Sequence, residues 1–211
     1  MIVASPALQL LLVYPQAVSF TEVWLLGPSH TAGNYPYNIT AKQNYKVYLG
    51  VANHLESFAY YQIQVKLCNE TQSTPDSLNS TPSSMPPLYN INMFVAQNET
   101  QEIPVDFSFD YSFQNVTRTV YNNVTIPPGA GSNGTVEQRA ENVTFLQAIF
   151  RSLRLTGVAL DLKGYSSDWN QLTRRTSGNL VFEVWIYNNA VGGFQYHERF
   201  VNLKLNITPL E

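Results

Sequence analysis

Nine asparagines of this sequence stand in the pattern that accepts N-linked sugars. Each begins Asn-x-Thr with no proline in the middle, so that its side-chain amide can be modified. The nine are Asn38, Asn69, Asn79, Asn98, Asn115, Asn123, Asn133, Asn142 and Asn206. The content of Asn, Ser and Thr leads us to expect about three by chance. The excess predicts a chain that carries N-linked glycans and is therefore exported. We expect no cofactor besides these glycans.

The other residue types that do chemistry form no catalytic constellation. The three histidines are widely separated and lack metal-ligand spacing. Glu102, Asp106 and Asp110 would share one face of a strand, with neighbours about 13 Å apart. That separation is too large for one cation or for the carboxylate pair of a glycosidase. We interpret the carboxylates as a solvated face and predict no catalytic residue, no metal site and no enzymatic activity.

Cys68 is the only cysteine, so no disulfide can form within the chain. It ends a run of alternating hydropathy in which Gln62, Gln64 and Lys66 occupy the same face. This pattern predicts a half-exposed thiol of no special reactivity, because a reactive cysteine needs exposure and a lowered pKa.

The first 19 residues carry no charge and include an apolar run between two prolines. If residues 7–14 are extended, one face presents Leu8, Leu10, Leu12 and Tyr14. A strand of this kind must be buried in its own domain, in a membrane or in another copy of the protein. A secretory signal peptide is disfavoured because no Lys or Arg precedes the run, and a membrane span would need about 20 apolar residues.

We favour burial in another copy, by donor-strand complementation. Burying the four side chains contributes about 6–12 kcal/mol, while ordering eight residues costs about 8–16 kcal/mol. Backbone hydrogen bonds to the neighbouring strand, at about 0.5–1.5 kcal/mol each, would make the free energy of insertion favourable. Repeated head to tail, this contact gives an open filament. The alternative is a hairpin within one chain, made by a turn at residues 15–19.

Behind the tail (1–19), residues 20–211 read as one all-β domain. Runs with period-two hydropathy predict strands at 18–27, 44–54, 59–68, 88–96, 101–110, 113–126, 153–162, 179–189 and 196–208. Residues 69–87 read as a long polar surface excursion. One short helix is predicted over 135–154, where Val136, Ala140, Val143, Leu146 and Phe150 fall at helical spacing. The architecture expected is an immunoglobulin-like or pilin-like antiparallel β-sandwich with an extended N-terminal tail.

Composition limits the class of partner. Charged residues make up 13% of the chain and the net charge is -3, which argues against nucleic-acid binding through a basic surface. No stretch predicts a transmembrane segment. Thirteen tyrosines among the aromatic residues would allow a surface that stacks on sugars, although alternating Tyr is also typical of a sandwich core and its rim.

Three segments carry a resemblance to a known family. FTEVWLLGPSHTAGNYPYNIT (20–40), VYLGVANH (47–54) and YHERFVNLKLNIT (196–208) resemble the extracellular sandwich domain of an uncharacterised archaeal membrane-protein family. Unlike that family, this sequence shows no membrane helix. Together with the sequons and the apolar tail, it looks like the subunit of the archaeal thread, a surface filament of Sulfolobus-type cells. The resemblance implies a type-I-pilin-like sandwich, N-glycosylation and head-to-tail assembly, with Leu8, Leu10, Leu12 and Tyr14 as the donor strand.

These observations predict an extracellular structural protein. The expected function is that of a glycosylated cell-surface filament subunit whose partner is itself, with other cells or surfaces as further contacts. The alternative is a monomeric, secreted cell-surface module that recognises sugars or S-layer protein. The two differ in whether the N-terminal segment pairs with another chain or with its own.

Overall fold

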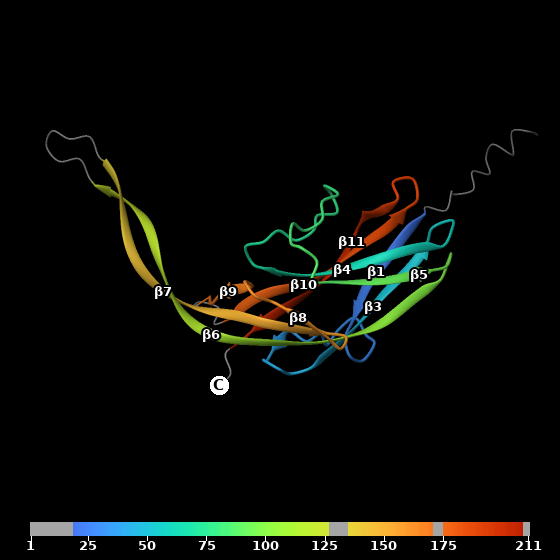
Figure 1. Ribbon diagram of the computed structural model, residues 1–211, viewed down its shortest axis with the longest axis horizontal. Coiled ribbons are helices and arrows are strands. Elements are labelled where there is room, and N and C mark those ends of the chain that lie inside the picture. Colours follow the sequence, from blue (N-terminus) through green and yellow to red (C-terminus); the bar gives the residue numbers. More distant parts are fainter. Residues whose placement is uncertain (1–18, 127–134, 171–174, 209–211) are drawn as a thin grey trace, which may run out of the picture.

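The computed structural model describes residues 19–126, 135–170 and 175–208, which form eleven strands (Figure 1). Their bounds are β1 Phe20–Leu26, β2 Asn38–Ile39, β3 Tyr45–His54, β4 Ala59–Asn69, β5 Tyr89–Val95, β6 Thr100–Ile126, β7 Thr135–Leu155, β8 Val158–Asp161, β9 Ser166–Asp168, β10 Thr176–Asn188 and β11 Gly193–Ile207. The described part of the chain contains no helix. The predicted all-β class is therefore confirmed.

Two sheets pack face to face as a sandwich. Sheet A has the order β1-β3-β6-β7-β8, with β9 also paired to β7. Sheet B has the order β2-β11-β10-β4-β5. All pairs are antiparallel except β2 with β11, which run parallel over two residues. One edge of the sandwich is thus formed by β1 from sheet A and by β11 and β2 from sheet B.

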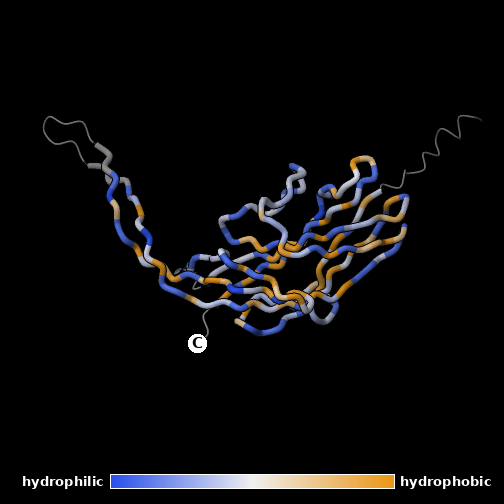
Figure 2. Tube along the Cα trace, in the orientation of Figure 1, coloured by the Kyte–Doolittle hydropathy of each residue, from blue (hydrophilic) through white to orange (hydrophobic). Residues whose placement is uncertain are grey.

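The core lies between the sheets and is built from the alternating apolar positions of each strand. Hydrophobic and hydrophilic residues alternate along the strands, as period two requires (Figure 2). The largest side chains that are fully enclosed include Tyr61, Phe107, Phe109 and Phe182. These belong to β4, β6 and β10, the central strands, so the interior is most closed in the middle of the sandwich.

The predicted helix at 135–154 is wrong, because this segment is strand β7. It pairs with β6 over its full length, from Thr135 opposite Ile126 to Leu155 opposite Phe107. The apolar residues that fit a helical period also include a set that alternates as in a strand. Pairing with the long strand β6 selects the strand over the helix. Thr156 and Gly157 close the β7–β8 hairpin with φ of 47° and 86°, the signs that a two-residue type I′ turn requires.

The β6–β7 pair extends beyond the sandwich as a two-stranded arm (Figure 1). Strand β7 pairs with β9 at Gln147–Ile149. On the N-terminal side of these residues, its only partner in the described chain is β6. A register shift between Asp110 and Tyr111 lies within the core, where Phe109, Tyr111 and Phe150 are buried. Such bulges bend strands and increase their twist, so this one bends the β6–β7 pair shortly before the arm leaves the sheet.

Gly50 allows β1 to pack closely on the sheet. It lies opposite Trp24, and a Cβ at residue 50 would fall 2.1 Å from the Trp24 ring. The indole therefore occupies the space that a side chain would need. We predict that Gly50→Ala lowers the free energy of unfolding by about 1–3 kcal/mol, because the ring must move. Urea denaturation measures this. Gly193→Ala is the matched control, since a Cβ added at residue 193 would meet nothing within 4 Å, and an equal loss in both variants would contradict the steric argument.

Candidate functional site

The open edge of the sandwich is the leading candidate site. Strand β1 pairs only with β3, so its outer edge has no strand partner in the described chain. Strand β11 pairs with β10 on one side, and on the other only its last residues, Asn206 and Ile207, meet β2. Both sheets therefore end here in unpaired backbone, the template that recruits an additional strand.

The space between these edges is a groove lined by both apolar and polar side chains, which we call the β1–β11 groove. A hollow of about 450 Å³ lies between the two strands. Its apolar lining includes Val23, Leu25, Tyr35, Val201 and Leu203. A second hollow of about 440 Å³ continues it toward the start of β1 and shares Val23, Trp24 and Phe200 with the first. The groove can thus receive a row of hydrophobic side chains along with a backbone.

A polar latch closes the groove near the start of β1. The His197 Nε2 lies 2.8 Å from the Thr21 hydroxyl, which is also 2.8 Å from the Tyr61 hydroxyl. Arg199 Nε donates to the Thr21 carbonyl at 3.3 Å. Residues 197 and 198 form an extra bulge in β11, with Glu198 at φ 57°. The bulge directs the His197 side chain toward β1, and its hydrogen bond with Thr21 connects sheet B to sheet A.

The other end of the groove is bounded by Tyr35. Its hydroxyl donates to the Leu25 carbonyl at 2.8 Å and so satisfies one edge acceptor of β1. The carbonyls of Thr21 and Leu25 both point to the open edge, and by strand alternation that of Val23 lies between them on the same edge. No partner for the Val23 carbonyl exists among the described residues. The backbone of Val23 is therefore where an incoming strand would bond to β1.

His197 makes the latch sensitive to pH. Burial, and then the neighbouring Arg199 charge, lower the pKa of His197 below its usual value of 6.5. The unfolded chain therefore binds a proton more readily than the folded one over the interval between the two pKa values. The contribution of neutral His197 is complete above pH 6.5 and declines as the pH falls toward the folded pKa.

We predict that the free energy of unfolding falls between pH 7.5 and 5, with His197 accounting for a slope of at most about 1.4 kcal/mol per pH unit. Urea titrations at half-unit intervals measure this slope. The matched variant His197→Gln keeps a polar partner for Thr21 but has no titrating ring, so its slope should be smaller. Superimposable pH profiles for the two proteins would contradict the assignment.

The sequon asparagines lie at the surface wherever their side chains are described. Those of Asn38, Asn79, Asn98, Asn115 and Asn142 are exposed, and those of Asn69 and Asn206 are half-buried. Asn123 belongs to β6, but its side chain lies outside the described part of the structure. The whole of Asn133 also lies outside it. Asn206 donates to the Asn38 side-chain oxygen at 2.7 Å, so two sequons meet beside the groove. The five exposed side chains are therefore accessible to sugars, whereas the amide oxygen of Asn206 is buried.

The donor residues Leu8, Leu10, Leu12 and Tyr14 lie outside the described residues, as does the tail up to residue 18. The predicted boundary between tail and domain at 19–20 stays a prediction, because the residues before it lie outside the described part. The carboxylates Glu102, Asp106 and Asp110 are exposed or half-exposed on β6, which is consistent with a solvated face.

The outer face of sheet B contains a buried ion pair that the sequence did not predict. Lys66 Nζ lies 2.7 Å from Glu183 Oε2, and the two residues are 3% and 0% exposed. The Ser83 backbone N–H donates to Glu183 at 2.8 Å, and Lys66 donates to the Ser83 carbonyl at 2.9 Å. The pair fastens the predicted surface excursion 69–87 onto β4 and β10.

This covering segment also corrects the prediction for Cys68. The thiol is fully buried rather than half-exposed, 3.5 Å from the Ser83 hydroxyl. Burial raises the pKa of Cys68, so the thiol stays protonated at neutral pH. A strand's outer face looks solvated in the sequence, but here a distant segment lies on top of it.

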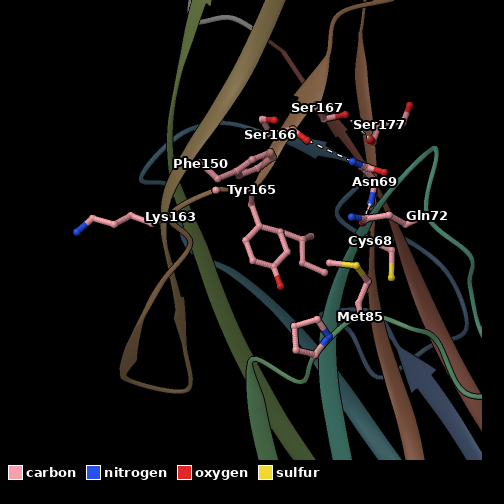
Figure 3. Close-up of a pocket in the computed structure, with 14 residues that line it drawn as sticks. Cys68, Asn69, Gln72, Met85, Phe150, Lys163, Tyr165, Ser166, Ser167 and Ser177 are labelled. Carbon is pink, nitrogen blue, oxygen red and sulfur yellow. Dashed lines mark hydrogen bonds between the residues drawn. The ribbon is translucent and has the colours of Figure 1, made fainter.

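A further hollow, of about 310 Å³, lies where β4 and β10 approach the loop before β9. Tyr165 projects into it from that loop, Lys163 points away, and Asn69 donates to the Ser166 carbonyl at 3.3 Å (Figure 3). The Tyr165 hydroxyl is buried without a hydrogen-bond partner in the described chain. The residues that line this hollow include neither His nor a carboxylate.

Metal-binding clusters and membrane-spanning helices are both absent from the described ranges. No group of three or more His, Cys, Asp or Glu side chains is placed to hold a metal ion in this part of the chain. Within the same ranges, no helix has the length and hydrophobicity needed to cross a membrane.

The groove could not be located from the sequence, because it is defined by the missing partner of two strands distant in the chain. The one available signal was that β1 and β11 are the first and last long strands of the described residues, which often form edges. The latch had a weaker signal: His197 interrupts the alternation of the closing strand, as a bulge residue does.

Comparison with known proteins identifies a family. A search of curated proteins found no match. Residues 15–143 match the family described as "Domain of unknown function (DUF1616)". The match takes in β1 to β6, including one wall of the groove, and ends within β7. Because it covers more than half of the chain, this protein belongs to the DUF1616 family.

Proposed function

We propose that this protein is a structural subunit of an extracellular, glycosylated filament, in which the N-terminal strand of one copy occupies the β1–β11 groove of the next. The carrying observation is the open edge of the sandwich, where both sheets have unpaired backbone beside a hollow lined in part by Val23, Leu25 and Leu203. A strand inserted there would pair with β1 or β11 and bury its alternate side chains.

The N-terminal segment has the chemistry that this groove accepts. Leu8, Leu10, Leu12 and Tyr14 repeat every second residue, as the pockets of an added strand require. The opposite face is also apolar at Leu11 and Val13. A hairpin on its own domain would leave that second face in water, whereas the body of a neighbouring copy can cover it. Insertion in trans is therefore favoured over pairing in cis.

The surface supports an exported role. The described sequon asparagines are exposed or half-exposed, and charged residues make up 13% of the chain. Neutral sugars on these positions would keep such a surface soluble and protect its backbone from proteases. We therefore place the filament outside the cell, with N-linked glycans as its only non-protein component.

Cysteine cross-linking tests the proposal. In a Cys68→Ala background, one chain carries Leu8→Cys, Leu10→Cys or Leu12→Cys, and a second carries Val23→Cys in the groove. Disulfides form only when Cα atoms lie about 4.4–6.8 Å apart, so one donor position should react best. We expect covalent dimers in mixtures of the two chains and a ladder of multimers from a chain that carries both cysteines.

The control places the acceptor cysteine at Val191, which is 61% exposed and lines neither hollow of the groove, and should give no ladder. If the doubly substituted chain yields only a monomer closed by an internal disulfide, the segment pairs within its own domain. That result would overturn the filament proposal.

A further inference from the structure

A cluster of aromatic rings lies on the outer face of sheet B, the face turned away from the core. Tyr60 and Phe94 stack with their centroids 4.2 Å apart and an angle of 11° between the rings. Phe194 lies 5.1 Å from Tyr60, and Tyr187 lies 5.4 Å from Phe194. The four rings come from four adjacent strands, β5, β4, β10 and β11, so they form one continuous row across the sheet.

This row is open to solvent. Phe94 is 68% exposed and Tyr187 is 39% exposed, while Tyr60 and Phe194 are partly covered by their neighbours. Phe94 belongs to β5, an edge strand, and only one of its ring faces meets Tyr60. Its other face is available for stacking. Exposing rings of this size without a ligand is costly, which marks the row as a contact surface.

A strip of side-chain amides runs beside the rings. Gln64 donates to Gln62 at 3.3 Å, and Gln62 donates to Asn92 at 3.2 Å. At the far side of the row, Asn188 donates to Gln195 at 2.8 Å. A side-chain amide has both donor and acceptor atoms. The Asn92 nitrogen and the Gln64 oxygen, at the two ends of this series of hydrogen bonds, have no partner in the described residues. The strip thus presents both donors and acceptors next to the rings.

We propose that this platform, formed by Tyr60, Phe94, Tyr187, Phe194 and the adjacent amides, binds a neutral glycan chain. A pyranose has a C–H face that stacks on an aromatic ring and hydroxyls around its rim that both donate and accept hydrogen bonds. The platform supplies both kinds of contact on one face of sheet B. None of its side chains is charged at neutral pH, so it offers no cation to an acidic polysaccharide. Its row of rings across four adjacent strands suits an extended chain of sugars.

This site is separate from the assembly groove. The platform uses the beginning of β11, around Phe194, whereas the groove uses Arg199, Phe200 and the residues after them. The inference therefore goes beyond the filament proposal and does not require it. In a filament, every subunit would display one such platform, and many weak contacts would add up to strong attachment.

Affinity electrophoresis with the full-length protein tests the inference. Native gels contain dissolved neutral β-glucan, α-mannan or, as the acidic comparison, polygalacturonate. We expect at least one neutral polysaccharide to retard the protein and polygalacturonate not to do so. Phe94→Ala and Tyr187→Ala should each weaken the retardation by about tenfold, which corresponds to the loss of one stacking contact. Phe94→Trp should restore it.

The matched control is Phe58→Ala, because Phe58 is 72% exposed but belongs to none of the ring contacts of the platform. It should leave retardation unchanged. The absence of retardation in both neutral gels would overturn the inference, as would retardation that survives Phe94→Ala combined with Tyr187→Ala. Sedimentation in parallel separates the two proposals: if the double variant changes only the assembled size, the platform is a protein contact and the glycan assignment is wrong.

Discussion

Replacing Lys66 with methionine should lower the free energy of unfolding by about 3–5 kcal/mol, because it leaves the carboxylate of Glu183 buried without its cation. Glu183 is 0% exposed, so water cannot take the place of the ammonium group. The remaining donors, Ser83 N–H and the Trp185 indole at 3.4 Å, are neutral and compensate only in part. Urea denaturation of the purified variant measures the loss.

Two controls separate this effect from a general loss of charge. Lys46→Met removes the partner of Asp106 from an exposed pair 3.5 Å apart and should cost at most about 1 kcal/mol. The double variant Lys66→Met with Glu183→Leu should recover most of the stability, because no unpaired charge is left inside. A double variant as unstable as Lys66→Met alone would show that the pair matters by its shape and not by its charge.

The same substitution should expose Cys68. Lys66 and Glu183 both bond to Ser83, which holds the covering segment over the thiol. Once that anchor is weakened, an Ellman-type thiol reagent should react with Cys68 faster than in the wild-type protein, under conditions where both are folded. Equal reaction rates would mean that the segment stays in place without the ion pair.

Removal of residues 1–14 should abolish assembly and leave a monomer with an empty β1–β11 groove. The deletion takes away Leu8, Leu10, Leu12 and Tyr14, which are the side chains proposed to fill the neighbour's hollow. The groove itself should persist, because the β1–β3 and β10–β11 pairs do not involve the deleted residues. Analytical ultracentrifugation of both proteins at equal concentration measures the difference.

A synthetic peptide of residues 1–14 should then bind the truncated protein. At 100 times its dissociation constant, a ligand specific to the folded state stabilises it by about 2.7 kcal/mol, which a thermal melt detects. The control peptide carries Leu10→Asp and Leu12→Asp and should have no effect. Polymers formed by the truncated protein, or equal stabilisation by both peptides, would contradict the assignment of the donor strand.

The sequence predicted most of the strands because their hydropathy alternates over short distances. In β3 and β4, Val47, Leu49, Ile63 and Val65 fall on the core face as period two requires. The segment 135–154 was misread as a helix for a physical reason: its apolar residues fit both periods. Only the partner strand β6, which pairs with it from Ile126 inward, selects the extended form.

What the sequence determined by itself was the local chemistry: the all-β pattern, the nine sequons, the uncharged apolar segment at 7–14 and the lack of a disulfide. Which strands lie at the edges, which outer faces are covered and which distant residues meet were decided only by the tertiary structure. The β1–β11 groove, the Lys66–Glu183 pair and the ring platform each join residues from two or more strands far apart in the chain. Such contacts depend on sheet order and register, and these follow from the packing of the whole domain.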